Sequence, residues 1–164
     1  MGHSITAILL KNEYDKTLAE EFDLFGISLE FNLTLFHIDH YYAAYWQAKL
    51  GTSGYLELAT IKNRLFPSEM VLADLMCKIS KCERPEYAIL VTHYFGGVGD
   101  QCANVFCGKQ LASKTVSTIN QALSYLGVLA KENLDEFDTL GLDKIRSQPV
   151  YLGKYIDLAD ELGV

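Results

Sequence analysis

The most distinctive stretch of the chain is a glycine-rich segment at residues 94–101, which reads YFGGVGDQ. Its glycines permit positive φ and a close approach of the backbone to a ligand, and successive N–H groups in such a turn can bind an anion. The candidate ligand-binding residues are the three glycines and the tyrosine before them: Gly96, Gly97, Gly99 and Tyr94. No Gly-Lys-Ser/Thr sequence follows, and Cys102 stands where the dinucleotide-binding fingerprint needs Gly or Ala. A structural hairpin turn is therefore the favoured interpretation.

Histidines and aspartates form a second candidate site. His37, Asp39 and His40 follow closely on one another, while His93 precedes the glycine-rich segment and Asp100 belongs to it. Two histidines and a carboxylate can hold zinc or iron, so His37, His40 and His93 are weak metal candidates. A histidine beside a carboxylate can also act as a general base, which makes His40 or His93, partnered by Asp39 or Asp100, a catalytic candidate. The alternative is that Asp39 caps a helix and the histidines are ordinary boundary residues, and no cofactor is predicted.

The four cysteines occur as two pairs with equal spacing, Cys77 with Cys82 and Cys102 with Cys107. Cys77 falls beside the apolar stripe of an expected helix, and Cys102 and Cys107 lie on opposite faces of an expected strand, so the four cannot share one metal ion. Small buried apolar residues are the favoured interpretation. Cys102 is kept as a candidate nucleophile because it follows the glycine-rich segment and can meet His93 across a hairpin.

An aromatic helix is expected at residues 40–50, after Asp39 as N-cap. Its four aromatic side chains are spread over a wide angle of the helix: Tyr41, Tyr42, Tyr45 and Trp46. One monomer core is not expected to bury all of them, and tyrosine and tryptophan are common at subunit contacts and in ligand pockets. This mismatch predicts a homodimer.

The acidity of the chain is concentrated near its C-terminal end. Residues 132–164 contain eight acidic and three basic residues, which is −5 of the total net charge of −7. A solvated helical face explains this balance most simply, and binding to a basic partner protein is the sharper alternative.

The apolar pattern along the chain indicates strands and helices without strict alternation. Expected strands are Ser4–Leu10, the alternating stretch Ile27–Leu35 with one solvent-facing side, and a hairpin of Glu86–Phe95 with Gln101–Cys107. Expected helices follow Asp15, Asp39 and Ser68, with others in 113–126, 134–140 and 152–162. Tyr55–Ile61 is ambiguous, with a slight preference for strand. The prediction is an α+β fold with a mixed or antiparallel sheet, a central β-hairpin and several packed helices.

Length and charge exclude several classes of function. A chain of 164 residues that is 49% apolar is expected to form a single globular domain over residues 1–164. Only three arginines and a net charge of −7 argue against nucleic acid as partner. No apolar run approaches the ~20 residues of a membrane span, and the N-terminal segment lacks the features of a secretory signal. With so few cysteines, the expected location is cytoplasmic.

The leading hypothesis is a small cytoplasmic binding or interaction protein, self-associating as a homodimer. Its working surface would include the glycine-rich turn at 94–101 and the aromatic helix at 40–50, with a small molecule or a protein as partner. The alternative is a small hydrolase-like enzyme that uses the histidines and aspartates beside the glycine turn. A weaker alternative is an acidic inhibitor of a basic protein.

Overall fold

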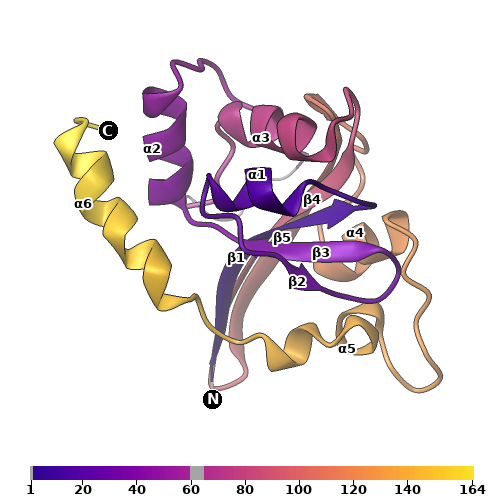
Figure 1. The fold of residues 1–164 in the computed structure, drawn as a ribbon. Helices are drawn as coiled ribbons and strands as arrows, with labels where there is room; N and C mark the ends of the chain where they lie inside the picture. Colours follow the sequence, from indigo (N-terminus) through magenta and orange to yellow (C-terminus); the bar gives the residue numbers. More distant parts are fainter. Residues whose placement is uncertain (1, 60–64) are drawn as a thin grey trace.

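A six-stranded antiparallel sheet forms the centre of the molecule (Figure 1). The computed structural model describes residues 2–59 and 65–164. The order of strands is β2-β3-β1-β4-β5-β6, and every neighbouring pair is antiparallel. The strands are β1 (His3–Lys11), β2 (Ile27–Ser28), β3 (Leu33–His37), β4 (Glu86–Phe95), β5 (Val98–Cys107) and β6 (Gln110–Leu111). The predicted α+β fold with its β-hairpin is confirmed.

Helices cover both faces of this sheet. On one face lie α1 (Lys16–Glu20), α2 (His40–Lys49), α3 (Val71–Ser80) and α6 (Lys154–Glu161), with α6 beside α2 in Figure 1. On the other face lie α4 (Ile119–Tyr125), α5 (Glu136–Leu140) and the short 3-10 helix η1 (Leu142–Lys144), whereas η2 (Val150–Gly153) leads into α6. Among the described residues, no helix combines the length and the apolar character that crossing a membrane requires.

The sheet separates two apolar cores because its central strands are buried on both sides. In β1, Ile8 and Leu10 belong to the first core, which packs against α1, α2, α3 and α6. Ile5, Ala7 and Leu9 point the other way and belong to the second core, which packs against α4, α5 and η1. This double coverage explains why the first strand reads as a nearly continuous apolar run and shows no alternation with polar residues.

The long alternating strand predicted over Ile27–Leu35 is wrong. The segment is a hairpin of two short strands, β2 and β3, with Phe31 and Asn32 both at positive φ, 62° and 58°. A two-residue turn of this kind needs positive φ at both positions, which glycine or asparagine usually signals in the sequence. Asn32 gives this signal, but Phe31 does not, and the apolar alternation continues across the turn. The predicted solvent-facing side is retained in part, because Ser28, Glu30 and Asn32 are exposed, whereas all of β3, including Thr34, is buried.

Two helices begin later than the sequence indicates. Helix α3 begins at Val71, and its backbone N–H donates to Oε1 of Gln47 at 2.9 Å, so a side chain of α2 takes the role predicted for Ser68. Helix α4 begins at Ile119 after a Thr118 cap with the reciprocal Gln121 contact. The ambiguous segment Tyr55–Ile61 forms only an isolated bridge at Tyr55, and its residues from 60 onward lie outside the described residues.

Candidate functional site

The glycine-rich segment forms the tight turn of the β4–β5 hairpin. Gly96 and Gly97 have φ of 60° and 79° and stand between the paired residues Phe95 and Val98. These values are those of a two-residue hairpin turn, which glycine adopts without strain. Gly99 has a different role, because a Cβ there would lie 1.9 Å from the carbonyl oxygen of His93. Hairpin geometry therefore accounts for all three glycines.

His37 and His93 lie far apart in the sheet. His37 pairs with Ala7 of β1, and His93 pairs with Ser4, so their Cα atoms are separated by about 10 Å along β1 and two strand spacings across it, roughly 14 Å in all. Ala7 and Ser4 also point to opposite faces of the sheet, and each histidine shares the face of its partner. The structure therefore does not bring these two imidazoles together. Among the described residues, no group of three or more His, Cys, Asp or Glu side chains is arranged to hold a metal ion.

Gln148 is the partner of His37. Its side-chain oxygen lies 3.0 Å from Nδ1 of His37 and accepts from the backbone N–H of Thr6 at 3.1 Å, while its amide donates to the carbonyl of Ile38. Burial lowers the pKa of His37, and the hydrogen bond with Gln148 raises it in part. His37 thus helps to fix the segment between η1 and η2 against strands β1 and β3.

Asp39 acts as the helix cap that the sequence predicts. Its Oδ1 accepts from the backbone N–H of Tyr42 at 2.7 Å at the start of α2. Burial raises the pKa of this carboxyl, opposed by the hydrogen bond from Tyr42. The ring of His40 lies against Tyr41, with centroids 4.0 Å apart.

The hairpin does bring part of the predicted catalytic group together. His93 and Asp100 are direct cross-strand partners on β4 and β5, and both are exposed. Cys102 is opposite Val91, so it is diagonal to His93 on the same face, but only 1% of its surface is exposed. Neither His93 nor Asp100 is a lining residue of the two cavities described below.

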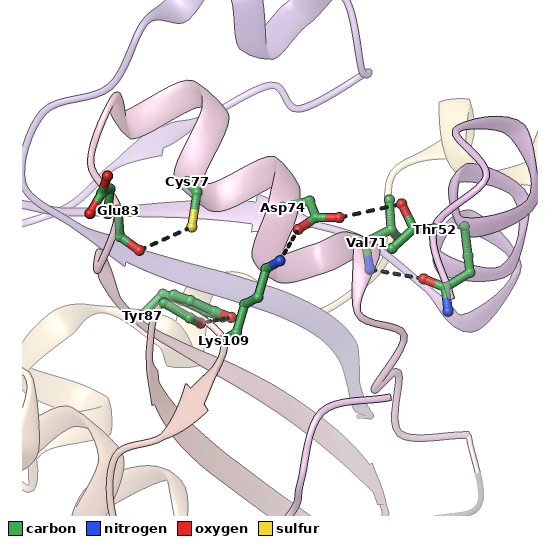
Figure 2. Close-up of polar contacts among 9 residues, drawn as sticks. Thr52, Val71, Asp74, Cys77, Glu83, Tyr87 and Lys109 are labelled. Carbon is green, nitrogen blue, oxygen red and sulfur yellow. Dashed lines mark hydrogen bonds and ion pairs between the residues drawn. The ribbon is translucent and has the colours of Figure 1, made fainter. Parts of the chain in front are cut away.

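Cys77 and Cys107 belong to a hydrogen-bonded structural region, in which Figure 2 shows Cys77, and Cys82 is exposed. The thiol of Cys77 donates to the carbonyl of Glu83 at 3.5 Å, and that of Cys107 donates to the neighbouring carbonyl of Arg84 at the same distance. Burial raises the pKa of Cys77, which disfavours the nucleophilic thiolate. Nearby, Lys109 pairs with Asp74 at 3.4 Å, a contact that fixes the β5–β6 turn to α3.

The aromatic helix α2 finds its main partner within the same chain. The hydroxyl of Tyr155 on α6 donates to Asp23 and accepts from Nε1 of Trp46 at 3.1 Å, and Lys154 pairs with Asp23 at 2.7 Å. The Tyr155 ring also packs against Tyr42, with centroids 5.0 Å apart. Burial, followed by the hydrogen bond to Asp23, raises the pKa of Tyr155. The surplus of aromatic side chains, on which the homodimer prediction rests, is largely covered by α6.

A cavity of about 310 Å³ opens on the opposite face of the sheet, where β1 begins and β4 ends. We call it the His3 pocket. Its polar lining consists of His3, Thr92, Gln101, Asn120, Asp135, Asp143 and Arg146. Its apolar and aromatic lining consists of Tyr94, Ile119 and Phe137. Tyr94 and Gln101 come from the two ends of the glycine-rich segment, so the base of that turn contributes to the pocket although its tip does not.

His3 is a fixed part of the pocket wall. Its Nε2 donates to the carbonyl of Leu142 at 2.8 Å, and its Nδ1 lies 2.7 Å from the hydroxyl of Thr92. That hydroxyl also accepts from the backbone N–H of Ile5 at 3.0 Å, and the ring of Phe137 packs against the imidazole at 5.3 Å. Both nitrogens of His3 are engaged, so its role is to join β1, β4 and η1.

Side chains of the pocket also fix α4 and α5. Gln101 accepts from the backbone N–H of Ile119 at 2.8 Å through Oε1. Asn120 accepts from the N–H of Phe137 at 2.9 Å and donates to Asp135 at 3.2 Å. These bonds define the positions of the two short helices, so the pocket is formed before any ligand arrives.

Two charged groups of the pocket remain available to a ligand. Arg146 uses Nε to donate to the carbonyl of Gly2 at 3.1 Å, which leaves the rest of its guanidinium free of partners among the described residues. Asp143 has no hydrogen bond or ion pair with any described residue. Although Arg146 and Asp143 line the same cavity, no ion pair within 4.0 Å joins them.

A larger hollow of about 790 Å³ lies between the end of β1 and the β2–β3 hairpin. It is more open than the His3 pocket, and Glu13 is its one charged lining residue among those described. The N–H of Asn12 donates to Asn32 at its floor, so the two turns are already joined. This hollow offers fewer converging charged groups and serves below as a control region.

Sequence reasoning missed the His3 pocket because its parts are distant in the chain. No local motif links His3 to Asp143 or Arg146, and the register that sets His3 opposite Tyr94 follows from the pairing of β1 with β4. The local signal for this pocket is the glycine-rich segment, of which the predicted ligand-binding residue Tyr94, and not the three glycines, lines the cavity. No known family, curated protein or solved structure matches this chain.

Proposed function

We propose that this protein binds a small molecule in the His3 pocket. The observation that carries the proposal is the convergence of β1, β4, β5, α4 and the segment from α5 to Arg146 on one cavity of about 310 Å³. Small-molecule sites are concave and mostly apolar, with a few placed polar groups, and their volumes are roughly 300–1,000 Å³. The His3 pocket lies at the small end of this range, which suits a ligand of metabolite size.

The hydrogen bonds of the pocket wall support binding more than catalysis. His3 supplies the imidazole of the pocket, and both of its nitrogens are engaged, so it is not placed to take a proton from a substrate. A wall fixed in this way lowers the cost of ordering the site when the ligand binds. The proposal thus keeps the binding-protein hypothesis and moves its working surface to the base of the glycine turn.

Amide chemical shifts provide the test of this proposal. A library of small metabolite-like compounds would be added to ¹⁵N-labelled protein, and the amide signals followed. We expect binders to shift the signals of Thr92, Gln101, Ile119 and Phe137, and to leave those of Asn12 and Asn32 in the larger hollow unchanged. Shifts confined to the larger hollow, or a library without any binder, would contradict the proposal.

Self-association and a cytoplasmic location complete the proposed function. The β4–β5 tip supports self-association, because Phe95 and Val98 are paired there with 82% and 79% of their surfaces exposed. The cytoplasmic location rests on the small number of cysteines, all four of which are free thiols. Light scattering of the purified chain tests the dimer, and a mass of 18.4 kDa at micromolar concentration would exclude it.

A further inference from the structure

The His3 pocket has an acidic side and a basic side. Asp135 and Asp143 lie on the acidic side, where both of them raise the pKa of the neighbouring Asp138, after the larger effect of desolvation. Arg146 lies on the basic side, where it is attached to Gly2 beside Tyr94. Asp135 is the cap of α5, and Arg146 lies after η1 with its side chain bonded to Gly2 ahead of β1, while no ion pair within 4.0 Å joins Arg146 to Asp143.

The wall between the two sides is apolar and aromatic. Phe137 packs on His3, and Ile119 and Tyr94 complete this surface. Gln101 adds one directional group, since its Oε1 accepts from Ile119 and its amide nitrogen has no partner among the described residues. The pocket therefore presents a carboxylate, a guanidinium, an amide donor and an apolar wall within about 310 Å³.

We propose that the ligand of the His3 pocket is a free amino acid with an apolar side chain. Its ammonium group pairs with Asp143, its carboxylate pairs with Arg146, and its side chain packs against Phe137. This assignment rests on the proposed function, because it names the class of ligand for the same pocket. It goes beyond that function by requiring both charges on one small molecule.

A ligand with a single charge fits the pocket less well. A simple amine would leave the guanidinium of Arg146 without a partner at the pocket wall, and a simple carboxylic acid would leave Asp143 without one. Charge-assisted hydrogen bonds to guanidinium and carboxylate groups are among the strong ones, so a ligand with one charge gains one of these interactions and lacks the other. The zwitterion is the smallest ligand that satisfies both sides.

Three matched compounds test this assignment on the unaltered protein: phenylalanine, phenethylamine and 3-phenylpropanoate. They share one aromatic group, and the second and third lack the carboxylate and the ammonium group respectively. We expect phenylalanine to bind tightest in calorimetric or amide-shift titrations, with each analogue weaker by roughly 10- to 100-fold, as expected for loss of a charged hydrogen bond. Equal affinities for the three compounds would overturn the assignment.

Charge-removing variants identify which side chain of the pocket binds the carboxylate of the ligand and which binds its ammonium group. Arg146→Gln should lower the affinity for phenylalanine to that for phenethylamine and leave the affinity for phenethylamine itself unchanged. Asp143→Asn should lower the affinity for phenylalanine and leave the affinity for 3-phenylpropanoate unchanged. Lys144→Gln is the matched control, because this exposed residue lies between the two positions in the chain and does not line the pocket. If Lys144→Gln weakens binding as much as the others do, the assignment is also overturned.

The outcomes separate this inference from the proposed function. One outcome is that other compounds shift the pocket amides while neither phenylalanine nor any other apolar amino acid does so. In that case the assignment fails and the binding function stands. If no compound shifts those amides, both fail. Since the three-compound comparison uses the unaltered chain, it decides the assignment even if a variant is unstable.

Discussion

The two faces of the sheet are covered in different ways. The first face carries three helices of eight or more residues, α2, α3 and α6, beside the five-residue α1, whereas the second carries α4 and α5, of seven and five residues. A helix of seven residues is about 10 Å long, while the ten residues of β4 span about 33 Å. Short helices cannot cover this length of strand. On the second face, the C-terminal end of β4 is therefore bounded by loops and the His3 pocket.

This difference in coverage separates stability from binding. On the first face, aromatic side chains from α2 and α6 fill the space, and their hydroxyl and indole groups bond to one another. On the second face, side-chain hydrogen bonds hold the loops in place around the His3 pocket and leave Asp143 and Arg146 at its wall. The closed face therefore stabilises the molecule, and the incompletely covered face is the one on which we propose that a ligand binds.

The largest expected effect comes from opening the first face. Tyr155→Ala should lower the free energy of unfolding by about 3–5 kcal/mol, because it removes a buried aromatic ring and leaves a cavity. Only 1% of Tyr155 is exposed, whereas 71% of Tyr55 is exposed. The matched control Tyr55→Ala should therefore cost less than about 1 kcal/mol. Chemical denaturation measures both, and equal losses would contradict a first face closed by α6.

A smaller effect is expected from the second face. His3→Phe keeps a ring in place but leaves the carbonyl of Leu142 and the hydroxyl of Thr92 without their partner, which should cost about 1–3 kcal/mol. The control His93→Phe alters an exposed histidine of the same sheet and should change stability by less than about 0.5 kcal/mol. His3→Phe should also reduce the amide shifts caused by ligands, whereas Tyr155→Ala should preserve them. Loss of binding in both variants would argue against two independent faces.

Local signals in the sequence predicted much of the fold. The β4–β5 hairpin and its turn follow from two adjacent glycines between apolar runs, and α5 ends at Gly141 as expected. The apolar stripe of α3 likewise follows from its spacing, although Gln47 and not Ser68 satisfies its first N–H. Where the chain turns without glycine, as at Phe31, the alternation misled the prediction.

The candidate site could not be predicted in the same way, because it depends on contacts between distant residues. His3 meets Leu142 across the whole length of the chain, and Asp23 meets Tyr155 only because α6 returns to α2. Neither contact leaves a pattern in the local sequence. The homodimer stays a prediction, and the contacts of α6 with the aromatic side chains of α2, on which its sequence argument depends, likewise leave no local pattern.

The smallest expected effect concerns the way the segment after η1 is held to the second face. Burial lowers the pKa of His37 from its ordinary value of 6.5, so the unfolded chain takes up this proton at a higher pH than the folded chain does. Stability is therefore lost as the pH falls below about 6.5, and the loss is complete once the folded-state pKa has been passed. His37→Gln should reduce the slope of unfolding free energy against pH between about pH 7 and 5, relative to the unaltered chain.

His93→Gln, at an exposed position of the same sheet, provides the control. The bond to Gln148 favours the charged imidazole, but burial disfavours it more, so a charged His37 is relieved by opening of the Gln148 segment, which also carries Arg146. Ligand affinity should therefore decline over the same pH interval in the unaltered chain and less in His37→Gln. An equal pH dependence of affinity in both would show that the pocket is independent of the Gln148 attachment, and the second face would then consist of two separately held parts.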